Sequence, residues 1–161
     1  MSALQHAAYD GDLDGVVAAL TEGSLVDARD DGNWTALHWV VDMGAAGGPR
    51  DKIIEALLDA GADIEARDLE GSTPIMVACR SGSGDLARQL ARSGADIGTR
   101  NSKGWTTLME AAAAGDTSMV IFLLEQDVDP SAREESGRTA LDIAIGQGFE
   151  DAVAILRAQP R

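Results

Sequence analysis

The sequence predicts an all-α solenoid, a row of stacked helix pairs, and three observations support this. Similar four-residue segments beginning at Thr73, Thr106 and Thr139 lie 33 residues apart, and each begins two residues after a glycine. A fourth copy begins at Thr35, which is 38 residues before Thr73, or one period plus five. After each threonine, small and apolar residues recur at helical spacing. A fixed period of this length indicates repeated supersecondary units that stack on one another.

The first helix of each repeat begins at the threonine. In the third copy Thr73 precedes Pro74. We expect the threonine hydroxyl to cap an unpaired backbone N–H, while proline at the first helical position loses no hydrogen bond. Small residues follow at 78–79 and 111–112, where two helices must approach closely. In the first copy, residues 4–8 are the expected inner helix.

The second helix of each repeat is expected to lie outside the first. In the first copy it covers residues 16–20, after a break at residues 11–12. Isoleucine and leucine recur at helical spacing in residues 53–58 and should fill the layer between neighbouring repeats. Leu90 and Leu124 are expected to be buried in the same kind of layer.

Glycine or a residue that tolerates positive φ is expected at the turns. Gly61 and Gly94 end two of the outer helices, where the left-handed conformation costs glycine least. Asp127 stands at the corresponding place in the fourth copy, and Asn33 replaces the glycine that precedes the other threonines. Asn and Asp are the non-glycine residues that best tolerate positive φ, so both copies should keep the fold.

The five extra residues fall in 44–50, between the two helices of the second copy. Three glycines and a proline in this segment predict a loop. It is either a tolerated surface insertion or a binding loop, since insertions in repeat proteins map to one face that often binds.

The repeated segments resemble the T-P-L-H start of ankyrin repeats, and residues 61–66 and 94–99 resemble the GADxxA turn of that family. The resemblance covers essentially the whole chain. It implies an all-α ankyrin-repeat solenoid with short β-hairpin fingers, a single domain over residues 1–161, and about five repeats including two caps. The expected repeats are 1–29 (N-terminal cap), 30–67, 68–100, 101–133 and 134–161 (C-terminal cap), with the inserted loop near 44–49.

The composition indicates in which cellular compartment the protein is expected. The chain is 45% apolar and 4% aromatic, and no run approaches the 18 or so apolar residues of a membrane span. The N-terminus has no positive region followed by a long apolar stretch, so a secretory signal is not expected. The single cysteine, Cys79, excludes an intramolecular disulfide and is expected to be a buried structural thiol. These features favour a cytoplasmic protein.

Charge is the more informative part of the composition. The net charge of −14 is divided unequally, with −11 in residues 1–79 and −3 in residues 80–161. Phosphate backbones and anionic membranes would be repelled, which argues against nucleic-acid or lipid binding. The acidity either serves solubility alone or favours a protein partner with a basic surface.

The resemblance also implies where a partner would bind, because ankyrin domains usually bind along the concave face made by finger tips and inner helices. The residues on that face with distinctive side chains are Tyr9, Asp10, Asp31, Trp34, Trp39, Asp42, Met43, Leu69, Glu70, Arg80, Lys103 and Trp105. Most lie in the first three repeats, whereas the inner-helix ends of the last two, at 113–114 and 146–147, are nearly featureless. Each tryptophan is either a binding anchor or a partly buried structural residue.

Catalytic and metal chemistry finds little support. The segment 10–15 opens like a calcium loop, but the twelfth position is Thr21 rather than the required carboxylate, and the repeat register already assigns residues 11–12 to a helix break. His38 matches the histidine of the family's T-P-L-H start and is expected to be structural. No nucleophile has a general base nearby in the repeat geometry. We therefore expect no enzyme, no cofactor and no metal.

The sequence thus predicts a non-catalytic protein–protein interaction module that presents a rigid concave surface, as a monomer, to a protein with a basic surface. An alternative is a cytoplasmic inhibitor or immunity protein that neutralises a basic enzyme or toxin. A structural scaffold and a small acidic enzyme are further alternatives.

Overall fold

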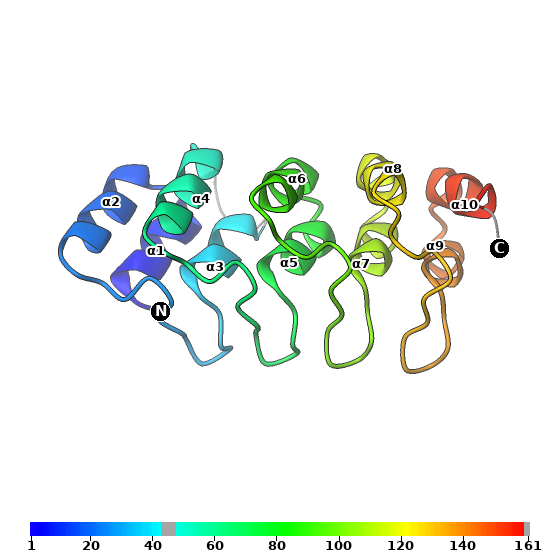
Figure 1. Ribbon diagram of the computed structural model, residues 1–161, viewed down its shortest axis with the longest axis horizontal. Coiled ribbons are helices and arrows are strands. Elements are labelled where there is room, and N and C mark those ends of the chain that lie inside the picture. The colour runs from blue at the N-terminus through cyan, green and yellow to red at the C-terminus, as the bar shows by residue number, and fades with distance from the viewer. Residues whose placement is uncertain (43–47, 160–161) are drawn as a thin grey trace.

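The computed structural model describes residues 1–42 and 48–159, and within them the chain is a row of helix pairs without strands (Figure 1). The inner layer is formed by α1 (Ala3–Asp10), α3 (Ala36–Val41), α5 (Pro74–Arg80), α7 (Thr107–Ala114) and α9 (Ala140–Gln147). The outer layer is formed by α2 (Leu13–Thr21), α4 (Arg50–Asp59), α6 (Gly84–Arg92), α8 (Thr117–Glu125) and α10 (Glu150–Arg157). The predicted all-α solenoid is confirmed. Met43 and residues 44–47 of the expected insertion lie outside the described residues.

The core lies between the two layers and between neighbouring pairs. Leu37, Ile75 and Leu108, each the second residue after its repeat threonine, are fully buried, and Leu90 is buried in the outer layer as expected. The expectation for Leu124 is wrong, because it is half-buried and the adjacent Leu123 is the fully buried residue. The buried side of α8 is formed by Met119, Val120 and Leu123, and Leu124, about 100° further round the helix than Leu123, lies at the edge of that side.

Several helix starts are capped by side chains, whereas α4, α5, α6 and α10 have no side-chain cap hydrogen bond. Ser2 with Gln5, Thr35 with His38 and Thr139 with Asp142 form capping boxes, in which each side chain bonds the backbone N–H of the other residue. Pro74 is the first residue of α5, as expected. The cap predicted for Thr73 is wrong, because its buried hydroxyl has no hydrogen-bond partner in the described residues.

His38 and Gln5 connect neighbouring repeats through side-chain hydrogen bonds. The Nδ1 atom of His38 accepts from the Thr35 backbone N–H (3.2 Å), so Nε2 carries the proton and donates to the Ser72 carbonyl (3.3 Å). Burial lowers the pKa of His38, which favours this neutral ring. Gln5 occupies the corresponding place in the first repeat and donates to the carbonyls of Ala28 and Trp34. The structural role expected for His38 is confirmed.

Four finger loops extend below the inner helices in Figure 1, and each is closed by one polar side chain at its base. The side chains of Asp30, Asp68, Asn101 and Glu134 each accept two backbone N–H groups of their own loop. The fingers are hairpin turns rather than strands, since Arg100 and Thr106 form the one isolated antiparallel bridge found within residues 1–42 and 48–159. Asn33 has a φ of 63°, and Asp127, at the end of an outer helix, has a φ of 59°, as the sequence indicated.

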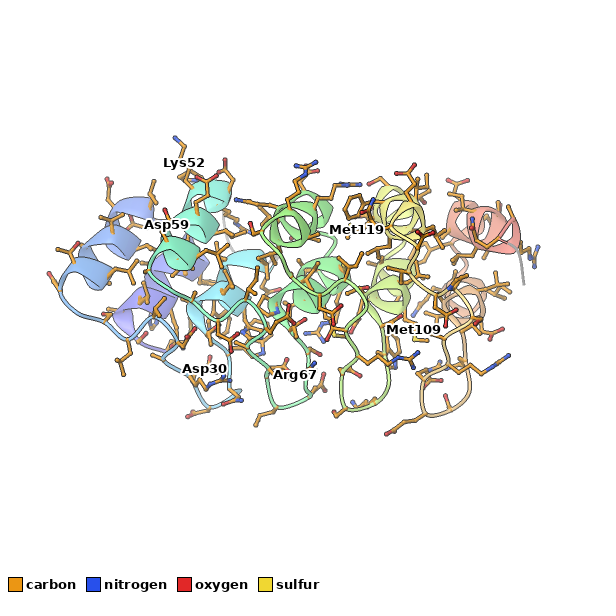
Figure 2. The ribbon with its side chains drawn as sticks, viewed as in Figure 1. Asp30, Lys52, Asp59, Arg67, Met109 and Met119 are labelled. Atoms are coloured by element: carbon orange, nitrogen blue, oxygen red, sulfur yellow. The ribbon has the colours of Figure 1, made fainter. Side chains whose placement is uncertain are left out.

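A ladder of arginines joins each finger to the next. Arg29 donates to the Arg67 carbonyl (2.8 Å), Arg67 to the Arg100 carbonyl (2.8 Å), and Arg100 to the Arg133 carbonyl (3.3 Å). Figure 2 shows Arg67 and Asp30 at the level of the fingers. Backbone hydrogen bonds between the finger tips run alongside the ladder, from Leu69 to Gly32, Ser102 to Glu70, and Glu135 to Lys103. The finger positions are therefore fixed relative to one another.

Leu90→Ala should lower the free energy of unfolding by about 2–5 kcal/mol, because it removes a fully buried side chain from between two repeats. Urea melts would measure this change. Leu25→Ala is the matched control, since Leu25 is 78% exposed and its truncation should have almost no effect. A loss below about 0.5 kcal/mol for Leu90→Ala would contradict the repeat packing described above.

Arg67→Lys tests the arginine ladder. The guanidinium of Arg67 bonds the Gly71 and Arg100 carbonyls and the Thr99 hydroxyl, and an ammonium group cannot reproduce this fork. We expect a loss of about 1–2 kcal/mol of unfolding free energy in urea melts. Arg92→Lys, on an exposed arginine with no such bonds among the described residues, should be silent. Equal effects of the two substitutions would rule out a specific role for the ladder.

Candidate functional site

The structure brings three of the expected site residues into one aromatic cluster, which consists of Tyr9, Trp34 and Trp39. The rings of Tyr9 and Trp39 meet edge to face with centroids 5.5 Å apart, and those of Trp34 and Trp39 are 4.7 Å apart. All three side chains are half-buried. The cluster therefore joins α1, α3 and the first finger and still forms part of the surface.

Both tryptophans of the cluster have a structural role. Trp39 Nε1–H donates to Asp30 (2.9 Å), and Trp34 Nε1–H donates to Asp68 (3.2 Å). These acceptors are the same carboxylates that close the first two fingers. The indoles thus tie the fingers to the inner helices, so the structural role that the sequence left open is present in both residues. Their exposed parts can still contact a partner.

The acidic residues expected near the cluster differ in how they are used. Asp10 and Asp31 are exposed, and among the described residues neither side chain makes a hydrogen bond or an ion pair. Asp42 is structurally engaged, because its carboxylate accepts from the Ser81 hydroxyl (3.1 Å). Leu69, at a finger tip, is 73% exposed. Within residues 1–42 and 48–159, Asp10 and Asp31 are therefore carboxylates without a partner on this surface, and Leu69 is an exposed apolar side chain.

A second group of residues surrounds an open hollow of about 440 Å³ between the fingers and the inner helices of the later repeats. We call it the finger hollow. Its lining residues are Glu70, Arg80, Asn101, Lys103, Trp105, Glu110, Glu134, Glu135, Ser136 and Arg138. Four of them, Glu70, Arg80, Lys103 and Trp105, were expected from the sequence. The surface of the fourth and fifth repeats is accordingly not featureless, because the fingers and α7 supply charges that the inner-helix ends lack.

Glu110, on α7, is the residue of this hollow that sequence reasoning missed. It stands four residues after its repeat threonine. The second, third and fifth repeats carry Trp39, Val77 and Ile143 at that place, and the N-terminal cap carries the exposed His6. A carboxylate in an internal repeat, where the neighbouring repeats have apolar residues, is the signal that could have identified it.

Ion pairs cross the hollow. Arg80 lies 3.7 Å from a carboxylate oxygen of Glu70 and 3.9 Å from one of Glu110, and Lys103 lies 3.4 Å from the other oxygen of Glu70. Arg138 Nε is 3.1 Å from Glu134 Oε1, and its guanidinium lies 6.0 Å from the centroid of the Trp105 ring. The cations of the hollow are thus all paired.

The electrostatics of Glu110 are unusual for a residue so close to the surface. It is 3% exposed, and burial raises its pKa to about 7. The guanidinium of Arg80 opposes this rise, while the charges of Glu70 and Asp68 add to it. The pKa of Glu134, by contrast, is lowered to about 2 because the Ser136 hydroxyl and backbone N–H bond its carboxylate. Two carboxyl groups of one hollow therefore differ in charge state near neutral pH.

The other candidate groups are structural. Cys79 is fully buried, and burial raises the pKa of its thiol well above the usual range, so it stays protonated. Asp12 of the calcium-like segment accepts the Gly15 N–H and caps α2, at the helix break predicted there. No group of three side chains suited to a metal occurs in the described part of the chain. No described helix is long and apolar enough to cross a bilayer.

A model of the ankyrin repeat family, built on three copies of the repeat, matches residues 1–68 and 75–160. The chain belongs to the ankyrin repeat family. It is 37% identical over 86 residues to a putative ankyrin repeat protein of Acanthamoeba polyphaga mimivirus. The aligned residues make up 53% of this chain and 11% of the viral protein. It is 34% identical over 71 residues to an ankyrin repeat-containing protein of Schizosaccharomyces pombe. These residues make up 44% of this chain and 32% of the yeast protein.

The ankyrin repeats are also similar to part of the 2-5A-dependent ribonuclease of Homo sapiens, with 37% identity over 81 residues, 50% of this chain and 10% of the ribonuclease. The aligned region makes up less than a third of each of these three relatives. The likeness therefore concerns the repeats themselves. Ankyrin repeats are generally protein–protein interaction modules, and the surface described above is of a kind that can serve this role.

Glu110→Gln should stabilise the protein at pH 8. The folded pKa of about 7 exceeds the ordinary value of 4.5, so ionisation of Glu110 disfavours the fold, and its contribution to stability falls as pH rises between those values. Glutamine has no such titration. We expect a gain of about 1–3 kcal/mol in urea melts at pH 8, with most of that gain absent at pH 5. A variant less stable than the parent at pH 8 would show that the Arg80 pair outweighs the cost of burial.

Proposed function

We propose that this chain is a non-catalytic protein-binding module whose partner presents a basic surface. The observation that carries the proposal is the combination, on the finger side of the first repeats, of free carboxylates and half-exposed aromatic rings. Asp10 and Asp31 have no partner within the described residues, and Leu69 adds an exposed apolar side chain. The net charge of −11 in residues 1–79 supplies a field of the matching sign.

Binding to such a surface would need little reorganisation. The capping boxes, the indole hydrogen bonds and the arginine ladder hold the fingers and inner helices in place before any partner arrives. A preorganised surface loses little conformational entropy on association. Its unpaired charges would act mainly on the rate of encounter, because opposite charge accelerates association more than it strengthens the final complex.

The proposal also includes a cellular compartment and an oligomeric state. A single buried cysteine suits the reducing cytoplasm, where we propose that the protein acts. Its negative charge opposes self-association, which favours a monomer. Capture from a cytoplasmic extract at low salt, followed by elution with salt, would identify the partner. Recovery of one dominant basic protein would favour an inhibitor, and recovery of several would favour a general scaffold.

Asp10→Lys combined with Asp31→Lys should slow association with that partner by about tenfold at low ionic strength. The difference should shrink at about 0.5 M salt, where charges are screened over a few ångströms. Stopped-flow kinetics with the purified partner would measure both rates. Glu125→Lys with Asp151→Lys is the matched control, since it changes the net charge equally on α8 and α10 of the outer layer. If the control pair slows association as much, net charge alone is responsible and the proposed surface is wrong.

A further inference from the structure

We propose that the finger hollow is a receptor for one lysine or arginine side chain of the protein partner, with Glu110 as its counter-ion. This inference rests on the proposed function, since it specifies how a basic partner is anchored. It moves the anchor from the first repeats to the third, fourth and fifth. Four properties of the hollow support it.

The first property is the unmet hydrogen-bonding capacity of Glu110. The side chain is 4% exposed, yet it accepts no hydrogen bond from any residue in the described part of the chain. Its one cationic neighbour there, Arg80, stands 3.9 Å away, beyond hydrogen-bonding distance. The Glu110 oxygens are not among the fully buried atoms without a partner, so they face the open hollow, where an incoming ammonium or guanidinium would supply charge-assisted donors.

The second property is the count of charges around the hollow. Its lining includes four carboxylates, Glu70, Glu110, Glu134 and Glu135, and three cations, Arg80, Lys103 and Arg138. The cations are held by Glu70 and Glu134 at 3.1–3.7 Å. Asp68 adds a further negative charge near Glu110, and the Cys79 thiol beside it is neutral. The lining therefore has one carboxylate more than it has cations, and with Asp68 the excess of negative charge is two, so the hollow can accommodate an additional cation.

The third property is an aromatic wall. Trp105 is half-buried and lines the hollow together with Glu110. The Arg138 guanidinium already lies 6.0 Å from its ring centroid, so the ring stands in a setting that accepts cations. A long basic side chain could lay its methylene groups against the indole while its charged end reaches Glu110.

The fourth property is size and access. A volume of about 440 Å³ falls within the range of about 300–1,000 Å³ that small-molecule pockets occupy. The hollow is open and bordered by three finger tips, so a side chain attached to a partner can enter it. A carboxylate would be a poor occupant, since it would meet Glu110 and would have to break the ion pairs of Arg80 and Lys103.

The test uses the capped tripeptide acetyl-Gly-Lys-Gly-amide and the same peptide with norleucine in place of lysine. The reporter is the indole N–H resonance of Trp105 in NMR spectra of the full chain. We expect saturable shifts with the lysine peptide and none with the norleucine peptide. Glu110→Gln should weaken binding at least tenfold, and Glu125→Gln, an exposed glutamate of α8 outside the hollow, should leave it unchanged.

The pH dependence gives a second readout. With a pKa of about 7 for Glu110, the ionised fraction falls about tenfold between pH 8 and pH 6, so the lysine peptide should bind about tenfold more weakly at pH 6. Glu110→Gln should remove this dependence. Equal shifts with both peptides, or unchanged binding by Glu110→Gln, would overturn the inference.

Its failure can be distinguished from failure of the proposed function. A purified partner that shifts the indole resonances of Trp34 and Trp39 but not that of Trp105 would overturn the receptor and leave the binding module intact. Saturable lysine binding in the hollow, without any protein captured through the acidic surface, would support the receptor and contradict the basic partner.

Discussion

The packing of each inner helix against the next is the interaction on which the rest of this structure depends. A single helix pair of this length cannot bury its apolar face, and Leu37, Ile75 and Leu108 are fully buried because a neighbouring repeat covers them. That row of buried side chains sets the spacing of the fingers. The finger-base side chains hold the shape of each finger. The arginine ladder then fixes the fingers relative to one another, because its links run between the same positions of adjacent repeats.

The acidity of the chain has two uses that composition alone cannot separate. Asp30, Asp68 and Glu134 accept backbone N–H groups that close the fingers, and Asp12 caps a helix, so these carboxylates belong to the scaffold. Such groups still contribute to the overall field, but they cannot rearrange to meet a partner. The charges free to do so are exposed ones such as Asp31. Net charge is therefore a sound guide to the sign of a partner and a poor guide to where it docks.

The architecture could be predicted from the sequence alone because equivalent residues recur at a fixed spacing, which is the length of one structural unit. The positive φ of Asn33 and the buried Leu90 follow from their places in that period. The failures are local. Leu124 and Leu123 are both apolar, and only the rotation of the helix decides which one is buried. Capping by Thr73 depended on hydroxyl geometry that sequence does not contain. The finger hollow was only half foreseen, because its walls come from three fingers and two helices that meet only in space.

Glu110 is the residue for which a purely structural explanation fails. At that place in the repeat, Val77 or Ile143 stabilises the solenoid by burial, whereas a carboxylate with a pKa near 7 and no hydrogen bond from the described residues opposes it. Arg80, at 3.9 Å, offsets only part of this cost. Strongly shifted carboxyl groups at the floor of an accessible hollow are typical of sites that bind or react. In a family that binds proteins, a receptor for one basic side chain is the simplest role that explains both the free-energy cost of burying Glu110 and its position in the hollow.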